Sequence, residues 1–338
     1  MSTRQLATQH RVVSWITVAV LSCALGATPA RAERELALVG ATIYPAPGAS
    51  AISNGIVIVR DGVIAAVGTR DDVSVRAKAD VLDCSGLSLT AGFWNSHVHF
   101  MPWRLAVAGW LPGADGIKLF TGGLAAPGSV VVMDTEIVRA ATTAAHERGA
   151  FVVAHPSNSA GARAAIEGGV DILAHTFPSG RDGPWDRSLL PRMKQAGMAL
   201  IPTMKLWEYE LRRAGRDRAT IERWIQVAQD QVRSFAALGG PILFGTDVGY
   251  VREYNPTDEY AYLAGAGLSF AQILATLTTA PAERFKHATR TGRIAVGMDA
   301  DLVTFEGDPR ADIRSLARVR HVVHHGRLVS RDEASPRR

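Results

Sequence analysis

The sequence predicts an α/β fold in which a parallel, TIM-like (β/α) barrel is flanked by short β-strands from both ends of the chain. Between residues 91 and 285, apolar strand-like runs alternate with amphipathic stretches, which is typical of parallel βα units. Before and after this part, short β runs are separated by turn residues. With 338 residues, 47% of them hydrophobic and 20% charged, the chain is globular and long enough for one large domain and a smaller one.

The first 32 residues have the pattern of a secretory signal segment. They contain no acidic residue, and two arginines precede an apolar run over residues 12–25. Ala30-Arg31-Ala32 then fits a cleavage site after Ala32. The run is shorter than the about 20 residues that a membrane span needs, so cleavage is favoured over an uncleaved anchor. The mature chain is therefore predicted to be secreted or periplasmic, with lipoprotein processing at Cys23 as the alternative.

Removal of this segment changes the charge of the chain. It takes away Arg4, Arg11 and Arg31, so the formal net charge falls from +5 to +2. This small charge does not indicate a nucleic-acid partner. The mature chain would retain one cysteine, Cys84, and so no internal disulfide.

The two β-rich flanks predict one composite domain. Residues 55–60 and 63–68 surround Asp61-Gly62, a pair that is typical of a β-hairpin turn. The later β runs are residues 292–297, 300–306 and 319–329. We expect a signal segment at 1–32, a small composite β-sandwich domain from 33–90 and 286–332, and the barrel at 91–285.

The central part contains six strand candidates with connecting helices. The strand candidates are residues 93–99, 116–120, 150–155, 170–175, 198–203 and 241–247. Residues 134–148 predict a helix that stops at Gly149, and residues 159–167 predict one that stops at Gly168. Pro191 weakens a third helix, over residues 185–195, which is expected to start late or to kink.

Residues that could bind metal lie at the carboxyl ends of these strands. Side chains alternate along a strand, so His97 and His99 face the same way and can reach one ion. The full set is His97, His99, Lys118, His155, His175 and Asp247. For each histidine taken alone, a structural role in the core or a loop is the favoured explanation. Because the carboxyl ends of parallel strands converge on one face of a barrel, their coincidence predicts a metal site.

The other candidate side chains carry less information. Lys118 is not a metal ligand as an ammonium ion, and it either has a pKa lowered by burial or reaches solvent. Five histidines lie on helix ends, connectors or the late β flank and are interpreted as structural or solvated: His146, His287, His321, His324 and His325.

Seven segments carry a family resemblance and run over nearly all of the mature chain. They are Thr90-Ala-Gly-Phe-Trp-Asn-Ser-His-Val-His, Gly113-Ala-Asp-Gly-Ile-Lys-Leu-Phe, Val152-Val-Ala-His-Pro, Gly169-Val-Asp-Ile-Leu-Ala-His-Thr, Leu243-Phe-Gly-Thr-Asp, Leu277-Thr-Thr-Ala-Pro-Ala and Gly292-Arg-Ile-Ala-Val-Gly-Met-Asp-Ala-Asp-Leu-Val. In this order they resemble the metal-dependent amidohydrolase superfamily, in particular imidazolonepropionase-related enzymes and secreted Xaa-Pro or Xaa-Arg dipeptidases.

The resemblance implies two divalent metal ions, zinc or else manganese or iron. His97, His99 and Asp247 would bind one ion, and His155 and His175 the other. Lys118, carboxylated by carbon dioxide, would bridge them. A metal-activated hydroxide would cleave an amide or peptide-like C–N bond in a small substrate, a cyclic amide or a dipeptide. Asp247 would act as general base and then as general acid.

The segment between His99 and Lys118 is shorter than the complete barrel of this family requires. Only 18 residues separate them, whereas a complete barrel has eight βα units and one βαβ unit takes about 30 residues or more. We therefore expect about six of eight units. The result would be an open sheet, a distorted smaller barrel, or a gap filled by another chain. An exposed edge there would favour homo-oligomers or aggregation.

Three hypotheses remain open. The chain is an active binuclear hydrolase, a catalytically defective relative that retains metal affinity, or a mononuclear enzyme that uses His97, His99, His175 and Asp247. The substrate is not specified, because the residues after the strand ends fit either a pocket or ordinary surface loops. These residues are Asn158, Lys205, Trp207, Tyr209 and Tyr250.

Overall fold

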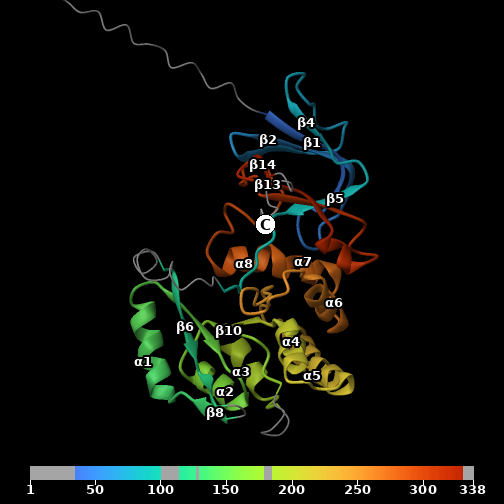
Figure 1. Cartoon of the computed structure of the whole chain (residues 1–338). Helices are drawn as coiled ribbons and strands as arrows, with labels where there is room; N and C mark the ends of the chain where they lie inside the picture. The colour runs from blue at the N-terminus through green and yellow to red at the C-terminus, as the bar shows by residue number, and fades with distance from the viewer. Residues whose placement is uncertain (1–34, 100–113, 127–128, 179–184, 330–338) are drawn as a thin grey trace, which may run out of the picture. The chain divides into compact units, whose positions relative to one another are not determined.

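The computed structural model describes residues 35–99, 114–126, 129–178 and 185–329, and their strands form three sheets (Figure 1). One sheet has eight strands, one has four, and two strands form a hairpin of their own. Helices α1 to α8 are described in addition. The α/β class is therefore confirmed.

The eight-stranded sheet joins the two ends of the described chain. Its order is β14-β13-β12-β5-β1-β2-β3, and β4 pairs with β1. The early strands are β1 (Glu35–Ile43), β2 (Ile52–Arg60), β3 (Val63–Gly68), β4 (Asp80–Asp83) and β5 (Leu87–Ala91), and the late ones are β12 (Leu302–Glu306), β13 (Val319–His324) and β14 (Arg327–Val329). Since β12 pairs antiparallel with β5, strands from the two ends of the chain, cyan and red in Figure 1, lie side by side. The pairings describe one sheet, so the two-layered sandwich stays a prediction.

The hairpin between β2 and β3 is confirmed at the predicted turn. Arg60 pairs with Val63 across Asp61 and Gly62, whose φ angles are 48° and 86°. Two positive φ angles in a two-residue turn match the right-handed twist of the strands that it joins. Glycine and aspartate adopt such angles more readily than most residues, which is why this turn could be located from the sequence.

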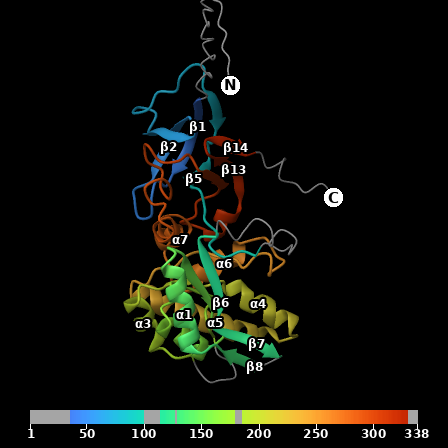
Figure 2. The ribbon, with the colours of Figure 1, turned by 90° about the vertical axis from the view of Figure 1, so that its left-hand side faces the viewer.

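The four-stranded sheet is parallel and carries the βα units. Its order is β11-β10-β9-β6, with β6 (Gly116–Phe120), β9 (Phe151–His155), β10 (Ile172–Ala174) and β11 (Ala199–Ile201). The helices between these strands are α1 (Thr135–His146), α2 (Ser159–Glu167) and α3 (Leu189–Gln195). The hairpin of β7 (Gly122–Ala126) and β8 (Ser129–Val132), which the sequence pattern did not predict, follows β6 (Figure 2).

Four of the six strand candidates form regular strands, and the other two are held by single bridges. Val98 forms a parallel bridge with Val248, and Ile242 forms one with Leu200 of β11. Among the described residues, no strand pairing joins β6 to the segment of His97, and no closed barrel is found. The chain that connects them, residues 100–113, lies outside the described residues.

The helices were predicted from the capping residues and glycines at their ends, and helices are found at these places. Asp134 accepts a hydrogen bond from the Glu136 amide at the start of α1, and α2 spans residues 159–167 as predicted. The helix with Pro191 begins late, at Leu189. The remaining helices are α4 (Met204–Arg213), α5 (Arg218–Ala237), α6 (Thr257–Gly265), α7 (Phe270–Leu277) and α8 (Thr279–Arg284), and a 3₁₀ helix spans Ile313–Ala317.

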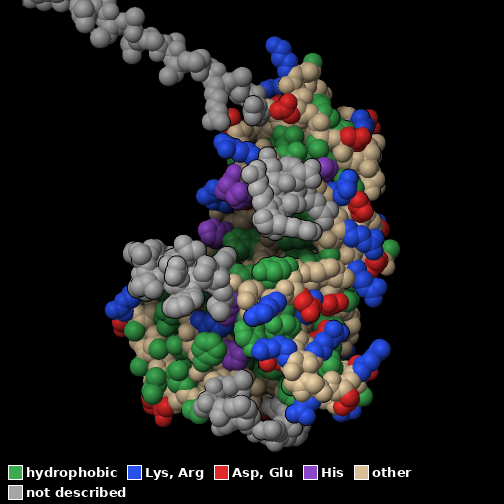
Figure 3. Space-filling view, in the orientation of Figure 1, with side chains coloured by type: hydrophobic (Ala, Val, Ile, Leu, Met, Phe, Trp, Pro, Cys, Tyr) green, Lys and Arg blue, Asp and Glu red, His purple; other side chains and the backbone are tan. Residues whose placement is uncertain are grey.

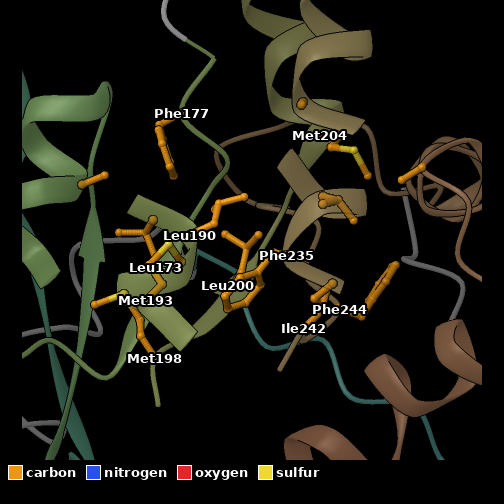
Figure 4. Packing of buried hydrophobic residues seen from close by; sticks show 14 of the residues in the cluster. Leu173, Phe177, Leu190, Met193, Met198, Leu200, Met204, Phe235, Ile242 and Phe244 are labelled. Carbon is orange, nitrogen blue, oxygen red and sulfur yellow. The ribbon is translucent and has the colours of Figure 1, made fainter. Parts of the chain in front are cut away.

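The largest hydrophobic core lies between the four-stranded sheet and its helices (Figure 4). Leu173 and Leu200 project from neighbouring strands and are fully buried, and Phe235 of α5 is fully buried in the same cluster. Burial of such side chains stabilises the fold by about 1.5–3 kcal/mol each. On the outside, hydrophobic side chains gather over α1 and β6 (Figure 3). Ile117 and Phe120 of β6 and Ile137 of α1 are exposed.

One predicted β run is wrong. Residues 292–297 form no strand, because Gly292 and Gly297 have φ angles of 94° and 86° that bend the backbone out of an extended path. Single hydrogen bonds fasten the segment, from the Ile294 amide to Pro45 and from the Gly297 amide to Ile64.

Within the part of the chain that the structure describes, no helix is long and apolar enough to cross a membrane.

Candidate metal centre

The six predicted ligands come from different parts of the chain and lie together at strand ends. Lys118 lies within β6, and His155 is the last residue of β9. His175 directly follows β10, while His97 and Asp247 belong to the two segments that are held by single bridges. The structure thus brings together side chains that are up to 150 residues apart in sequence.

The segments of His97 and Asp247 are fastened to each other through their backbones. The Asp247 amide donates to the His97 carbonyl (2.9 Å), and the His99 amide donates to the Val248 carbonyl (2.7 Å). A Cβ atom on Gly249 would lie 1.8 Å from the His99 carbonyl oxygen, so only glycine fits this close approach. Asp247 itself has a φ of 58°, a strained backbone angle that aims its side chain at the histidines.

The side chains meet at short distances. Oδ1 of Asp247 lies 2.9 Å from Nε2 of His97 and 2.9 Å from Nε2 of His99. Nζ of Lys118 lies 3.2 Å from Nε2 of His97. The ring centroid of His175 is 4.8 Å from that of His97 and 4.6 Å from that of His155.

The donor set fits a divalent metal ion. Ligand atoms of His97, His175 and Asp247 all lie within 4.8 Å of one another, and all three residues are buried. Oδ1 of Asp247 is buried and forms no well-aligned hydrogen bond. A buried carboxylate oxygen without a partner is costly, and a cation would satisfy it. Imidazole and carboxylate are the ligands that zinc, manganese and iron accept.

The protonation states favour the same interpretation. Burial lowers the pKa of His97 and the pKa of His175, and it lowers the pKa of His155 to about 4. Burial alone would raise the pKa of Asp247, but the imidazoles of His97 and His99 outweigh it and hold this pKa well below its usual range. Neutral imidazoles beside an ionised carboxylate are the ligand forms that a metal needs.

Lys118 is half-buried rather than solvated. Burial lowers the pKa of its amine, although Asp247 opposes this shift. Its Nζ also lies 5.3 Å from the centroid of the Phe120 ring. Of the two predictions for this lysine, a lowered pKa is the one that agrees with the geometry.

Three side chains that sequence reasoning missed hold the ligands in place. Oγ1 of Thr203 lies 2.5 Å from Nδ1 of His175. Oγ of Ser157 lies 2.9 Å from Nε2 of His155 and donates to the Gly122 carbonyl. Asn95 donates to Oγ1 of Thr246, and its Oδ1 accepts from the Thr246 and His97 amides. Such partners orient metal-bound histidines. The available signal was their position within two residues of a ligand or at the end of a strand.

The five residues suggested as pocket lining have different roles. Tyr250 lies near the site, with its ring centroid 6.3 Å from that of His99, and Tyr209 lies 6.3 Å from Tyr250. Lys205 is buried in ion pairs, and Asn158 caps α2. The fifth residue, Trp207, donates to Oγ1 of Thr176.

Three of the remaining histidines, His146, His287 and His324, have other partners. His146 lies 2.8 Å from a carboxylate oxygen of Asp171, and His324 lies 2.9 Å from one of Asp301. The ring of His287 packs against Trp94. Their interpretation as residues outside the metal site therefore agrees with their contacts.

Comparisons with known proteins identify the family. The model of the amidohydrolase family matches residues 103–329. A Xaa-Pro dipeptidase crystallised with methionine in its active site is similar in structure, with a TM-score of 0.73 and 19% identity over 88% of this chain and 100% of the other. A candidate prolidase from Bifidobacterium longum has a TM-score of 0.74 and 23% identity over 90% and 96%. For molinate hydrolase the values are 0.71 and 14%, over 90% and 96%. No curated protein matches the sequence. Because the family model covers about two thirds of the residues, the chain belongs to the amidohydrolase family.

Proposed function

We propose that the chain is a metal-dependent hydrolase that acts on amide or peptide-like C–N bonds of small substrates. The observation that carries this proposal is the buried Asp247 oxygen, which has two imidazole nitrogens at 2.9 Å and no hydrogen bond. This arrangement is unfavourable without a cation and favourable with one. Membership of the amidohydrolase family supports the reaction class.

The candidate ligands and the side chains that contact them would have different roles. We assign His97, His99 and Asp247 to one metal ion, and His155 and His175 to a second. A divalent ion bound here would lower the pKa of a water molecule and polarise the carbonyl of the scissile bond. The contacts of Asn95, Ser157 and Thr203 would orient the ligands. Because the site is buried, each charge interaction within it is stronger than it would be in water.

Asp247 is proposed to move the proton. It is ionised at neutral pH, because its pKa is held below the usual range by the adjacent imidazoles. The carboxylate would accept the proton that leaves the attacking water and would then donate it to the departing amine nitrogen. The low pKa favours the second transfer but makes the carboxylate a weak base for the first, which would therefore need a water molecule made acidic by a bound ion.

Lys118 decides between a binuclear and a mononuclear site. Its amine, with a lowered pKa, would combine with carbon dioxide to form a carbamate and release one proton, which would convert an unfavourable cation into a bridging anion. Removal of the side chain in Lys118→Ala is expected to lower the metal content from two ions per chain to one or none. A wild-type content of one ion that Lys118→Ala leaves unchanged would instead support the mononuclear site.

The substrate is proposed to be a dipeptide or a related small amide. The similar structures include proteins described as a Xaa-Pro dipeptidase and a prolidase. Tyr250 offers an aromatic surface beside His99, and Tyr209 lies next to Tyr250, which suits an apolar or cyclic side chain next to the scissile bond. Molinate hydrolase, another similar structure, is a reason to include molinate in the assay.

The proposal is tested with purified mature protein loaded with zinc, manganese or iron. We expect bound metal and turnover of at least one Xaa-Pro dipeptide, N-acyl amino acid or cyclic amide, with loss of turnover after chelation. A folded, metal-loaded protein that turns over no member of this panel would support the catalytically defective relative. A folded protein that takes up no metal would contradict both.

A further inference from the structure

The start of helix α4 is capped in an unusual way. Its N-cap residue, Thr203, has a left-handed backbone with a φ of 43°, and its side chain makes no capping hydrogen bond. A threonine at this position ordinarily accepts a hydrogen bond from an amide of the first turn. Here its Oγ1 lies 2.5 Å from Nδ1 of His175 instead. Both side chains are buried, so this contact is sheltered from water.

A carboxylate from another helix takes over the cap. Glu259 of α6 accepts hydrogen bonds from the Met204 amide (3.0 Å) and the Lys205 amide (2.8 Å). These amides belong to the first turn of α4 and would otherwise lack an acceptor. Only 1% of the Glu259 surface is exposed, so its carboxyl oxygens are held at the positive end of the helix dipole with little access to solvent, and burial raises its pKa to about 7.

The side chain of Lys205 reinforces the same connection. Its Nζ lies 3.0 Å from carboxylate oxygens of both Glu253 and Asp258, and it donates to the Asn255 carbonyl (3.1 Å). Backbone and side chain of the second α4 residue are thus both fastened to the segment at residues 253–259. The position of Thr203 is set by this segment rather than by α4 alone.

We propose that Glu259 is a positioning residue for His175. By capping α4 from outside, it frees the Thr203 hydroxyl to hold Nδ1 of His175, which leaves Nε2 as the ring nitrogen for a metal ion. The inference rests on the proposed function, since it concerns a histidine assigned as a metal ligand. Loss of a hydrogen bond to a metal-bound histidine typically weakens metal affinity about 10- to 100-fold.

The test compares metal affinity in four variants, measured by competition with a chelating dye, together with the visible spectrum of the cobalt-loaded protein. Thr203→Val and Glu259→Ala are each expected to weaken zinc binding about 10- to 100-fold and to change the cobalt spectrum. Thr203→Ser, which keeps the hydroxyl, should restore most of the affinity. The double variant Thr203→Val/Glu259→Ala should be no weaker than Thr203→Val, because Glu259 acts through Thr203.

Glu35→Gln is the matched control, since Glu35 is an equally buried carboxylate in the eight-stranded sheet. It should alter stability but neither affinity nor spectrum. If Glu259→Ala does not fold, Glu259→Gln, which keeps one acceptor oxygen, should weaken affinity in the same direction by a smaller factor. A Glu259 variant that loses stability but retains wild-type affinity and spectrum would overturn the inference alone. A folded wild-type protein that binds no zinc would overturn the proposed function, and the inference with it.

Discussion

Two regions of this protein bury a carboxylate, and they neutralise it in different ways. In the eight-stranded sheet, Glu35 is 4% exposed and lies 2.7 Å from Nε of Arg60 and 3.4 Å from Nε of Arg76. At the strand ends of the parallel sheet, Asp247 is 2% exposed, and its closest neighbours are imidazole nitrogens. Guanidinium groups carry a permanent charge and donate hydrogen bonds, whereas neutral imidazoles supply no charge.

We interpret the difference as one between a structural site and the proposed metal site. Burial alone would raise the pKa of Glu35, but hydrogen bonds and charge from the two arginines outweigh it and lower this pKa without any ligand. Asp247 has no such pair of arginines to neutralise it. Its Oδ1 forms no well-aligned hydrogen bond, and Lys118 is the cationic side chain among the six predicted ligands. A protein retains such an arrangement where an added cation completes it.

The largest effect is expected for Asp247→Asn. The amide has the same shape but does not accept a proton from the attacking water and binds metal weakly, so kcat/KM should fall by about 10²- to 10⁴-fold. Asp308→Asn serves as the control, because Asp308 pairs with Tyr44 and Arg310 in the β-rich part. Similar losses in both variants would contradict the contrast between the regions.

Metal removal should destabilise one region and spare the other. A ligand present at 100 times its dissociation constant stabilises the folded state by about 2.7 kcal/mol, so chelation should lower the unfolding temperature. Hydrogen exchange of the metal-depleted protein should show faster exchange near His175 and Asp247 than in β1 and β2. Uniform acceleration in both places, or none in either, would show that the metal does not act where we place it.

The sequence predicted which candidate ligands would lie together better than it predicted the residues that hold them in place. Strand-end histidines could be found because the alternation of β and α elements fixes where strands end. The capped helix at residues 159–167 was located to the residue, whereas the one predicted at 134–148 spans residues 135–146. In contrast, Thr203 and Glu259 are 56 positions apart in sequence, and no local pattern connects them.

Strand pairing was the other point that the sequence did not specify. Residues 93–99 and 241–247 have the composition of strands, but each is held by an isolated bridge. Hydrogen-bonded pairing depends on neighbours from distant parts of the chain, which no local sequence pattern specifies. The predicted run at residues 292–297 failed for a local reason, since two glycines with positive φ interrupt it.

A smaller effect is expected from acid in the metal-depleted protein. The pKa of His155 is lowered to about 4 from an ordinary value of 6.5, so between these pH values the unfolded chain binds a proton that the folded chain does not. The stability due to this difference is complete above pH 6.5 and is lost as the pH falls toward 4. His155→Gln should flatten the dependence by at most about 1.4 kcal/mol per pH unit, the limit for one proton. Identical slopes in urea titrations at pH 7, 6 and 5 would contradict the assigned shift.

The smallest effect is expected for a substitution of the other buried carboxylate, Glu35 in the eight-stranded sheet. Glu35→Gln keeps the volume and one acceptor oxygen but removes the charge that faces Arg60 and Arg76, so the free energy of unfolding should fall by about 1 kcal/mol in urea denaturation. Both arginines are partly exposed, and water compensates for part of the loss. Metal content and kcat/KM per folded molecule should stay at the wild-type level, because this carboxylate is neutralised within the sheet. If this substitution reduced metal binding as strongly as Asp247→Asn, the two buried carboxylates would not be independent, and the separation of a structural from a functional site would fail.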